Sequence, residues 1–367
     1  MENSTSIRVW SYDEEYDELK DEIIGAVDRV FRSGRLLFGR ELEGFESEFS
    51  KWLGVRRTFG VANGTDALRI ALMALGVSND DDVITVSSTA VPTVSAIREV
   101  GANPVFVDIS LDDYNIDVSQ VEESITKKTK CIICVHLYGQ PANIIELKKI
   151  AKRNDLYLIE DCAQAHGAKF GNVKVGTFGD ISCFSFYPTK ILGGYGDSGA
   201  CVTNCDKLAE RIKMIRFYGM REQYFFEIEG INSRMDEVHA AILRIKLKYL
   251  DQDLRQRKHI AEFYDSSIAN SLILKSRTFR DREHAYYLYV IRCKQRDELL
   301  NYMTQNGVYL NISYPWPVHT MPPFSKYSDL DFPNSNTLSK EVLSLPMYPK
   351  LTDQKLERVV DLINAFK

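Results

Sequence analysis

The chain has 367 residues, of which 46 are lysine or arginine and 51 are aspartate or glutamate, giving a formal net charge of −5. A hydrophobic fraction of 44% and a charged fraction of 26% are typical of a globular protein and exclude a long disordered tail, a collagen-like repeat and a coiled coil. The slight acidity predicts no surface for nucleic acid or for an anionic membrane, and no apolar run reaches the ~20 residues that span a bilayer.

The N-terminal residues and the cysteines bear on the cellular compartment. Residues 1–22 are too acidic for a secretory signal peptide. The seven cysteines are odd in number and dispersed, and four lie in apolar, strand-like runs: Cys131, Cys134, Cys183 and Cys201. We therefore expect reduced core cysteines in a cytoplasmic protein. Cys131 and Cys134 have zinc-finger-like spacing, but an offset of three points strand side chains to opposite faces, so no metal site is expected.

Short apolar runs alternate with helical patterns from about residue 51 to residue 204. Several runs are almost continuously apolar, as in strands that are buried on both faces. The clearest strands are 83–88, 103–109, 130–139, 156–161, 181–186 and 199–204, and helical stretches include 144–154 and 207–217. This alternation predicts an α/β fold with a mostly parallel, doubly covered sheet. Ligands of such sheets bind beyond the carboxyl ends of the strands.

The character of the sequence changes after a long helical pattern at 236–268. The later segments are a strand-like run, an aromatic and proline-rich stretch and a final helical pattern, at 286–292, 313–323 and 352–366. They predict a smaller α+β domain, with the boundary near residue 250, inside the long helix. The expected division is a large domain at 1–250 and a small C-terminal domain at 251–367.

The segment 62–76, ANGTDALRIALMALG, predicts a helix. Thr65 or Asp66 can cap its N-terminus, and its apolar residues follow with helical spacing. Gly64 lets a phosphate approach the backbone, and the exposed N–H groups of a first helical turn bind anions. A well-capped core helix explains the segment equally well, so both interpretations stay open here.

Two further segments place charged groups after strands. Glu160 and Asp161 end an apolar strand, where a carboxylate can bind a metal, act as a base, hold a protonated heterocyclic nitrogen or cap the next loop. Lys190 follows the strand at 181–186 and precedes a glycine-rich turn. Partial burial there favours the neutral amine, which is a nucleophile and forms Schiff bases, although a surface lysine in a loop is the alternative.

The three segments together predict more than each one alone. A phosphate-binding turn, a strand-end aspartate and a lysine 29 residues after it are what pyridoxal phosphate requires. This cofactor needs an anchor for its phosphate, an anion at its pyridine nitrogen and an amine that forms a Schiff base.

Motifs spread over nearly the whole chain resemble, in the same order, those of the DegT/DnrJ/EryC1/StrS aminotransferases. They are SGRLLFGRELEGFE, VANGTDAL, VHLYGQP, EDCAQAHGA, FSFYPTK, GDSGA, NSRMDEVHAAIL, YPWPVH and LSLPMYP. The resemblance implies a pyridoxal-phosphate enzyme of fold type I that aminates a nucleotide-linked keto-sugar. It also implies a large cofactor-binding domain, a small C-terminal domain and a homodimer with shared active sites.

The resemblance assigns roles to residues by motif. Lys190 would hold the cofactor as a Schiff base and then shuttle the proton, and Asp161 would keep the pyridine nitrogen protonated. The other cofactor-binding residues would be Gln164 near the 3′-oxygen of the ring, Gly64, Thr65 and Ser185 at the phosphate, and Asn232 from the partner subunit. Substrate-binding residues would be Tyr218, Tyr224, Arg234, Tyr314 and His319.

Two segments depart from the pattern of the family. Thr89 is followed by Ala90, Val91 and Pro92, where many relatives have an aromatic residue that stacks on the cofactor ring. No stacking residue is therefore assigned. The segment 283–292, EHAYYLYVIR, stands where many relatives have a Trp-His pair, so sugar contacts are not assigned there.

The resemblance predicts a transamination with glutamate as amino donor and a dTDP-linked 3-keto-6-deoxyhexose as acceptor, for surface polysaccharide (lipopolysaccharide) or glycoside biosynthesis. The run at 232–251 resembles the subgroup that makes 3-amino sugars, and Ser233 stands where relatives that act at carbon 4 more often have an aromatic residue. The alternatives are amination at carbon 4, a non-nucleotide keto-cyclitol or aminobenzoate-precursor substrate, and a non-catalytic regulator that binds the cofactor. An intact pair of Lys190 and Asp161 argues against the regulator.

Overall fold

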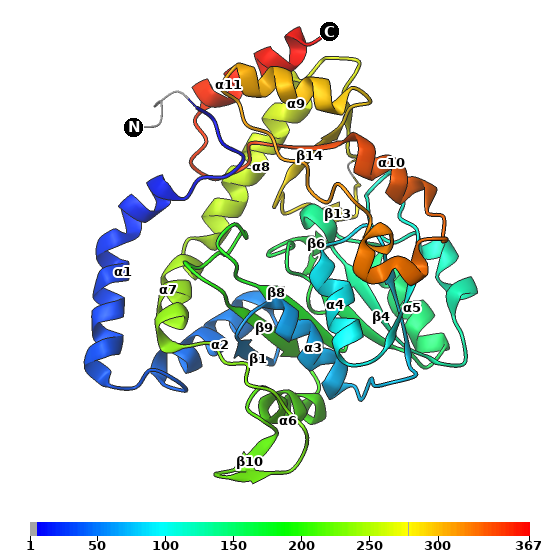
Figure 1. Ribbon diagram of the computed structural model, residues 1–367. Helices are drawn as coiled ribbons and strands as arrows, with labels where there is room; N and C mark the ends of the chain where they lie inside the picture. The colour runs from blue at the N-terminus through cyan, green and yellow to red at the C-terminus, as the bar shows by residue number, and fades with distance from the viewer. Residues whose placement is uncertain (1–5, 278) are drawn as a thin grey trace.

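A seven-stranded sheet forms the centre of the larger part of the molecule (Figure 1). The structure is a computed structural model that describes residues 6–277 and 279–367. The strands lie in the order β1-β9-β8-β5-β4-β2-β3. Their bounds are Arg57–Val61 (β1), Asp82–Val86 (β2), Asn103–Val107 (β3), Thr129–Val135 (β4), Tyr157–Asp161 (β5), Ile181–Ser185 (β8) and Gly199–Thr203 (β9). The four pairings from β8 to β3 are parallel, whereas β9 runs antiparallel to both β8 and β1, so the prediction of a mostly parallel sheet is confirmed.

Helices cover both faces of this sheet, as the apolar strands require. One face packs against α3 (Gly64–Ala74), α4 (Val91–Glu99) and α6 (Asp206–Ile215). The other face packs against α5 (Ile144–Arg153), α2 (Arg40–Leu53) and α7 (Glu237–Leu247). Cys131 lies in the core on the α3 side and Cys134 in the core on the α5 side, which confirms that the two thiols diverge.

The structure differs from the sequence prediction at two elements. Strand β1 was not predicted, because its short run RTFGV begins with a charge and contains a glycine. The helix predicted at 236–268 is wrong as one element, since α7 ends at Leu247 and α8 (Leu250–Ser267) begins after a break. Helix α1 (Asp13–Ser33) lies beside α7 and buries its apolar stripe against it (Figure 1).

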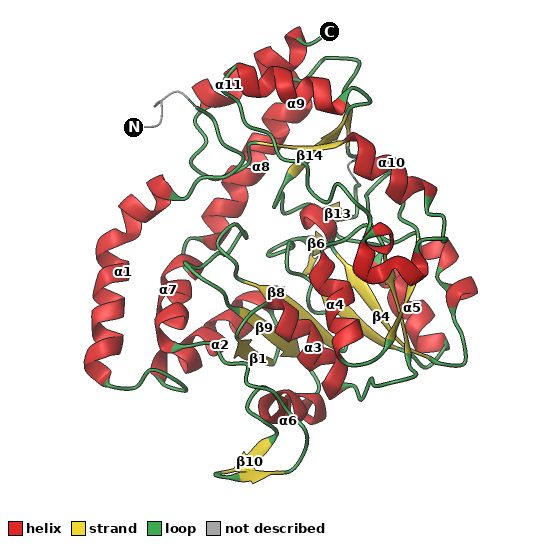
Figure 2. Cartoon of the chain, in the orientation of Figure 1, coloured by secondary structure: helices red, strands yellow, loops and turns green. Residues whose placement is uncertain are grey.

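The C-terminal residues build a second, smaller core above the large sheet (Figure 2). Its three-stranded sheet has the order β12-β14-β15, with bounds Leu274–Lys275, Tyr289–Arg292 and Val342–Leu345. Helices α8, α9 (Arg296–Gln305) and α11 (Asp353–Ala365) pack against it. Because α8 contributes Leu250 to the core of the large sheet and Ile260 to the smaller core, it spans both, and a boundary near residue 250 stays a prediction.

The remaining elements are short. They are β6 (Lys169–Phe170), β7 (Val173–Lys174), β13 (Arg282–Glu283), α10 (Pro333–Glu341) and the hairpin of β10 (Met220–Glu222) and β11 (Phe225–Phe226). In the described part of the chain, none of the helices combines the length and the apolar character that crossing a membrane requires.

Candidate active site

A cavity of about 230 Å³ lies at the carboxyl ends of β5 and β8, where an open parallel sheet is expected to bind its ligand. It brings together six residues that the sequence predicts for cofactor binding: Gly64, Thr65, Asp161, Gln164, Ser185 and Lys190. Its other lining residues include Asn63, Thr89, Ala90, Pro92, Thr93, Tyr187 and Asp197. The lining residues come from positions as far apart as Asn63 and Asp197, and the fold brings them to this one edge of the sheet.

The N-terminus of α3 forms one end of the cavity. Asn63 caps it by accepting a hydrogen bond from the N–H of Asp66 at 2.8 Å, so the predicted caps Thr65 and Asp66 are wrong by two or three positions. A Cβ at Gly64 would lie 2.7 Å from the Cβ of Ser185, which means that only glycine lets the first turn lie against that serine. Unpaired N–H groups of a first turn beside a hydroxyl suit a phosphate.

Asp161 is buried at the end of β5, with 6% of its surface exposed. Its carboxylate accepts hydrogen bonds from the hydroxyl of Thr93 at 2.9 Å and from the N–H of Ala163 at 3.1 Å. Burial raises the pKa of Asp161 above its ordinary value, although these bonds and the charge of Lys190 act in the opposite direction. A buried carboxylate that is costly to ionise is stabilised by a cationic partner, so the residue fits a protonated pyridine nitrogen.

Glu160, the residue before Asp161, does not line the cavity. Its carboxylate accepts from the N–H groups of Gly176, Phe178 and Gly179 at 2.8, 2.8 and 2.7 Å. It also accepts from the Ser182 hydroxyl and lies 3.1 Å from Nε2 of His136. Burial raises the pKa of Glu160, but the hydrogen bond and charge of His136 and the backbone donors outweigh burial and leave it lowered.

Cys162 lies with His136 and Glu160 in a buried group whose ligand atoms are within 4.8 Å of one another. Each of the two ionisable partners is already engaged, because Nδ1 of His136 accepts from the N–H of Ala142 at 3.1 Å and Nε2 faces Glu160. Burial raises the pKa of the Cys162 thiol well above its ordinary value. The group is therefore a structural hydrogen bond between His136 and Glu160 beside a buried thiol rather than a metal centre.

The loop after β4 fixes the side chain of Gln164. Gln164 accepts a hydrogen bond from the N–H of Tyr138 at 2.8 Å and donates one to the hydroxyl of Tyr314 at 2.8 Å. Tyr138 is fully buried with φ of 58°, a strained conformation for a bulky residue, and its ring stacks against that of Tyr314. Gln164, a predicted cofactor contact, is thus hydrogen-bonded both to the loop after β4 and to Tyr314 in the C-terminal part of the chain.

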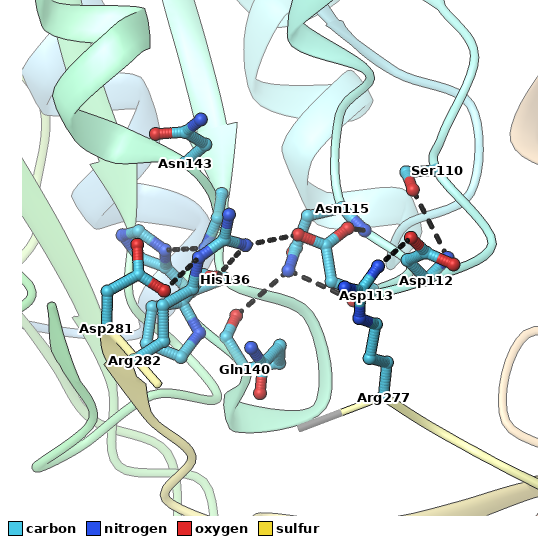
Figure 3. A network of polar contacts seen from close by, with 12 residues as sticks. Ser110, Asp112, Asp113, Asn115, His136, Gln140, Asn143, Arg277, Asp281 and Arg282 are labelled. Atoms are coloured by element: carbon cyan, nitrogen blue, oxygen red, sulfur yellow. Dashed lines mark hydrogen bonds and ion pairs between the residues drawn. The ribbon is translucent and has the colours of Figure 1, made fainter. Parts of the chain in front are cut away.

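A polar network supports this loop from the outer side (Figure 3). The side chain of Asn115 accepts from the N–H of Leu137 at 2.9 Å and donates to the carbonyl of Gln140 at 3.1 Å. The guanidinium of Arg282 forms an ion pair with Asp113 and donates to the carbonyl of Pro141. The network ties the loop to the segment before β14.

Lys190 is half-buried in a turn after β8, and its N–H donates to the carbonyl of Tyr187 at 2.8 Å. Its amine lies 4.5 Å from the centre of the Tyr287 ring. The partial burial that the sequence predicts for Lys190 is confirmed, and the amine lines the same cavity as Asp161.

Other predicted residues lie outside the cavity of this chain. Tyr218 and Tyr224 are exposed at and near the β10–β11 hairpin, at 41% and 81%. Asn232 is also exposed, and the guanidinium of Arg234 packs over the rings of Phe217 and Tyr218. Their contribution to a site shared with a partner subunit stays a prediction.

His319 does not line the cavity either. It is 1% exposed, its Nδ1 lies 2.5 Å from the hydroxyl of Ser87, and its ring packs against Phe332. Direct substrate contact therefore does not fit this position. His319 instead holds the loop that carries Thr89 at the cavity wall.

Sequence reasoning missed several residues of the site. Asn63 and Thr93 precede or begin helices, and a cap position just before a glycine could have indicated Asn63. Thr93 offered no signal, because its bond to Asp161 joins positions 68 residues apart. Tyr287 lies in the segment whose contacts were left unassigned, and Tyr187 lies inside the FSFYPTK motif.

The residues present fit pyridoxal phosphate at three points: the α3 N-terminus with Ser185 for its phosphate, Asp161 for its ring nitrogen and Lys190 for its aldehyde carbon. Comparison with known proteins agrees. Residues 17–364 match the sequence profile of the DegT/DnrJ/EryC1/StrS aminotransferase family.

Two curated relatives cover almost the whole chain. A dTDP-3-amino-3,4,6-trideoxy-alpha-D-glucose transaminase from Micromonospora megalomicea subsp. nigra is 45% identical over 97% of this chain and 97% of its own. A dTDP-3-amino-3,6-dideoxy-alpha-D-galactopyranose transaminase from Aneurinibacillus thermoaerophilus is 41% identical over 94% and 95%. The crystal structure of S. venezuelae DesV in complex with a ketimine intermediate superposes with a TM-score of 0.95, at 39% identity and 98% coverage of both chains.

Proposed function

The chain belongs to the DegT/DnrJ/EryC1/StrS aminotransferase family, and on that basis we propose which amino transfer it performs. It is an aminotransferase whose cofactor is pyridoxal phosphate. The proposed acceptor is a dTDP-linked 3-keto-6-deoxyhexose, which becomes the 3-amino sugar, and the proposed donor is glutamate. The observation that carries the proposal is the cavity that unites Lys190, Asp161 and the N-terminus of α3.

Amination at carbon 3 is supported by the relatives and by one residue. Both curated relatives carry names of dTDP-linked 3-amino sugars, at 45% and 41% identity. Ser233 is fully buried, and its hydroxyl accepts from the N–H of Ala62 at 3.0 Å. A small side chain at this position lets the segment that carries Asn232 and Arg234 pack directly against the strand that leads into α3.

Residues of the chain would bind pyridoxal phosphate at three places: its phosphate, its ring nitrogen and its ring. The first turn of α3 and the hydroxyl of Ser185 hold the phosphate, and Asp161 holds a positive charge at the ring nitrogen. Gln164, oriented by Tyr138 and Tyr314, faces the ring. When bound, pyridoxal phosphate supplies an aldehyde for Schiff-base formation and a conjugated ring that accepts electrons from a substrate C–H bond.

Lys190 then serves as the acid and base of the reaction. Once a substrate amine has taken its place, Nζ is a free amine that removes a proton from the substrate carbon and returns it to a neighbouring carbon. Its position in the turn after β8 keeps Nζ at the cavity wall. Asp161 keeps its negative charge throughout, because a neutral side chain there would no longer stabilise the positive ring nitrogen.

We further propose a cytoplasmic homodimer that serves the biosynthesis of a surface polysaccharide or a glycoside. Apolar side chains are exposed on two separate elements that a partner could cover. They are Ile24 and Phe31 on α1, and Phe225 and Phe226 on β11, each more than half exposed. Asn232 is exposed as well, and it pairs with Phe217, three residues before β10.

Visible absorption spectra of the purified protein test the proposal. With pyridoxal phosphate, the wild type should form a yellow band that Lys190→Ala lacks, and glutamate should bleach it. A dTDP-linked 3-keto-6-deoxyhexose should restore the band, whereas a 4-keto sugar should not. Restoration by the 4-keto sugar alone would overturn the proposed carbon, and a band shared by the wild type and Lys190→Ala would overturn the role of Lys190.

A further inference from the structure

Tyr287 is the aromatic side chain on which the amine of Lys190 rests. The two lie 97 residues apart in sequence, and Nζ is 4.5 Å from the centre of the ring, within the range of a cation–π contact. Tyr287 belongs to the segment HAYYLY, where this chain departs from the Trp-His pair of many relatives. The resemblance to the family therefore does not by itself predict this contact.

The ring of Tyr287 is held in place from two sides. Its hydroxyl lies 3.1 Å from Oγ1 of Thr189, the residue before Lys190. The fully buried guanidinium of Arg257 donates to the carbonyls of Tyr286 and Tyr287, at 3.0 and 3.4 Å. The tyrosine and the lysine turn are therefore fixed relative to each other, and an amine that swings away from the cavity meets the same face of the ring each time.

Tyr287 also lies between two cavities. A second cavity, of about 250 Å³, is lined by Tyr287, Thr189, Tyr314 and Tyr187. Tyr187 lines the cavity of Lys190 as well, so the two cavities share a wall. Lys190 lines the first cavity while its amine contacts Tyr287, so the contact lies at this wall.

We propose that Tyr287 is a positioning residue whose ring face stabilises the amine of Lys190 in its ammonium form, both in the cofactor-free protein and after the amine has taken a proton during the reaction. This inference rests on the proposed function, which supplies the steps in which Lys190 takes and returns a proton. The neutral amine takes the proton from the substrate carbon and becomes an ammonium, which the electron-rich face of the phenol stabilises until the proton is returned. The other charged and titratable groups near Lys190 are Asp161 and His166, on whose pKa values its charge acts, and Tyr187 and Asp197, which line its cavity.

Chemical labelling of the cofactor-free protein tests this without any reaction. A reagent that acylates only neutral amines is added at pH 8, and the labelling rate of Lys190 is followed by mass spectrometry. Tyr287→Leu should raise this rate by ~2–5-fold, since a contact of this kind favours the charged amine by about that factor. Tyr287→Phe, which keeps the ring face, should stay near the wild-type rate. Tyr286→Leu is the matched control, because the Tyr286 ring stacks on His284.

A series of fluorinated phenylalanines at position 287 separates the ring charge from the shape of the ring. Each added fluorine withdraws electron density from a ring of nearly constant size, so the labelling rate of Lys190 should rise stepwise along the series. A rate that does not change with fluorination, or an equal rate in the wild type and Tyr287→Leu, would overturn the role of Tyr287. Because the protein carries no cofactor here, these results are independent of the spectra that test the proposed function.

Discussion

Glu160 and Asp161, the adjacent carboxylates at the end of β5, are expected to differ when each is replaced by its uncharged amide: the first change should reduce stability and the second should reduce the reaction rate. Glu160→Gln keeps the shape of a side chain to which five groups donate hydrogen bonds. The three donors at Oε1, from Phe178, Gly179 and Ser182, can keep an oxygen as their acceptor. The new NH₂ group then faces the N–H of Gly176 and Nε2 of His136, which are donors themselves.

The cost of Glu160→Gln follows from this geometry. Two buried donors lose their acceptor, and each unsatisfied donor costs about 1–3 kcal/mol, so the free energy of unfolding should fall by roughly 2–6 kcal/mol. A thermal unfolding curve of the cofactor-free protein should shift down by on the order of 5 °C or more. The pKa of Glu160 is lowered in the fold, so the stability it provides is present above its unfolded pKa and is lost as pH falls through the folded pKa.

Asp161→Asn is the matched variant one position away. Burial raises the pKa of Asp161, so the charged form is unfavourable in the fold, and the stability of the cofactor-free protein falls as pH rises through that pKa. The amide keeps an acceptor for the N–H of Ala163 and can donate to Thr93, so the unfolding temperature at pH 7 should stay the same or rise. The transamination rate should fall by about 100-fold or more, because the charge at the ring nitrogen is gone.

The two variants together can refute the reasoning. A Glu160→Gln protein that unfolds at the wild-type temperature would show that the buried donors find other partners. An Asp161→Asn protein with the wild-type rate would show that the charge of Asp161 is not used in the reaction. A large loss of stability in Asp161→Asn with a normal rate would reverse the two roles.

Two further predictions concern the cofactor and the partner subunit. Gly64→Ala places a Cβ 2.7 Å from the Cβ of Ser185 and should weaken pyridoxal phosphate binding by ~5–100-fold in an absorbance titration. Gly25→Ala is the control, because the nearest atom to its new Cβ is 3.7 Å away, and it should leave the affinity unchanged. Equal affinities of the two variants would mean that α3 and Ser185 move apart freely. Lys190→Ala and Asn232→Ala proteins should each be inactive alone. After mixing and exchange of subunits they should regain about a quarter of the wild-type activity, because half of the dimers are mixed and one of the two sites in each mixed dimer has both residues. No recovery would contradict a shared site.

The strands and the cofactor residues could be predicted from the sequence because their signals are local. A strand that is buried on both faces must be almost continuously apolar, and β4 and β8 are. Asp161 ends β5 and Lys190 lies five residues after the end of β8, and the topology of a parallel sheet places the ends of its strands at one edge. The motif resemblance then supplied the chemistry of these positions.

The sequence was less informative where a residue depends on a distant partner. His319 lies in a motif of the family, yet its partner is Ser87, 232 residues away, and the structure buries it beside Phe332. The break between α7 and α8 at Lys248 and Tyr249 has no proline or glycine to mark it. In both cases the packing of residues that are distant in sequence decides the local structure, and the local sequence pattern does not predict it.

The sequence by itself determined the α/β class, the mostly parallel sheet and the cofactor, and it predicted Lys190 as the residue that binds it, since each follows from periodicity, strand ends or ordered motifs. Tertiary structure alone decided that Glu160 is a structural acceptor outside the cavity, although it is adjacent to Asp161 and chemically alike. Successive side chains of a strand point to opposite faces, so Glu160 meets His136 and the backbone donors, while Asp161 meets the cavity. It also decided that the amine of Lys190 rests on Tyr287, because only folding brings these two segments together.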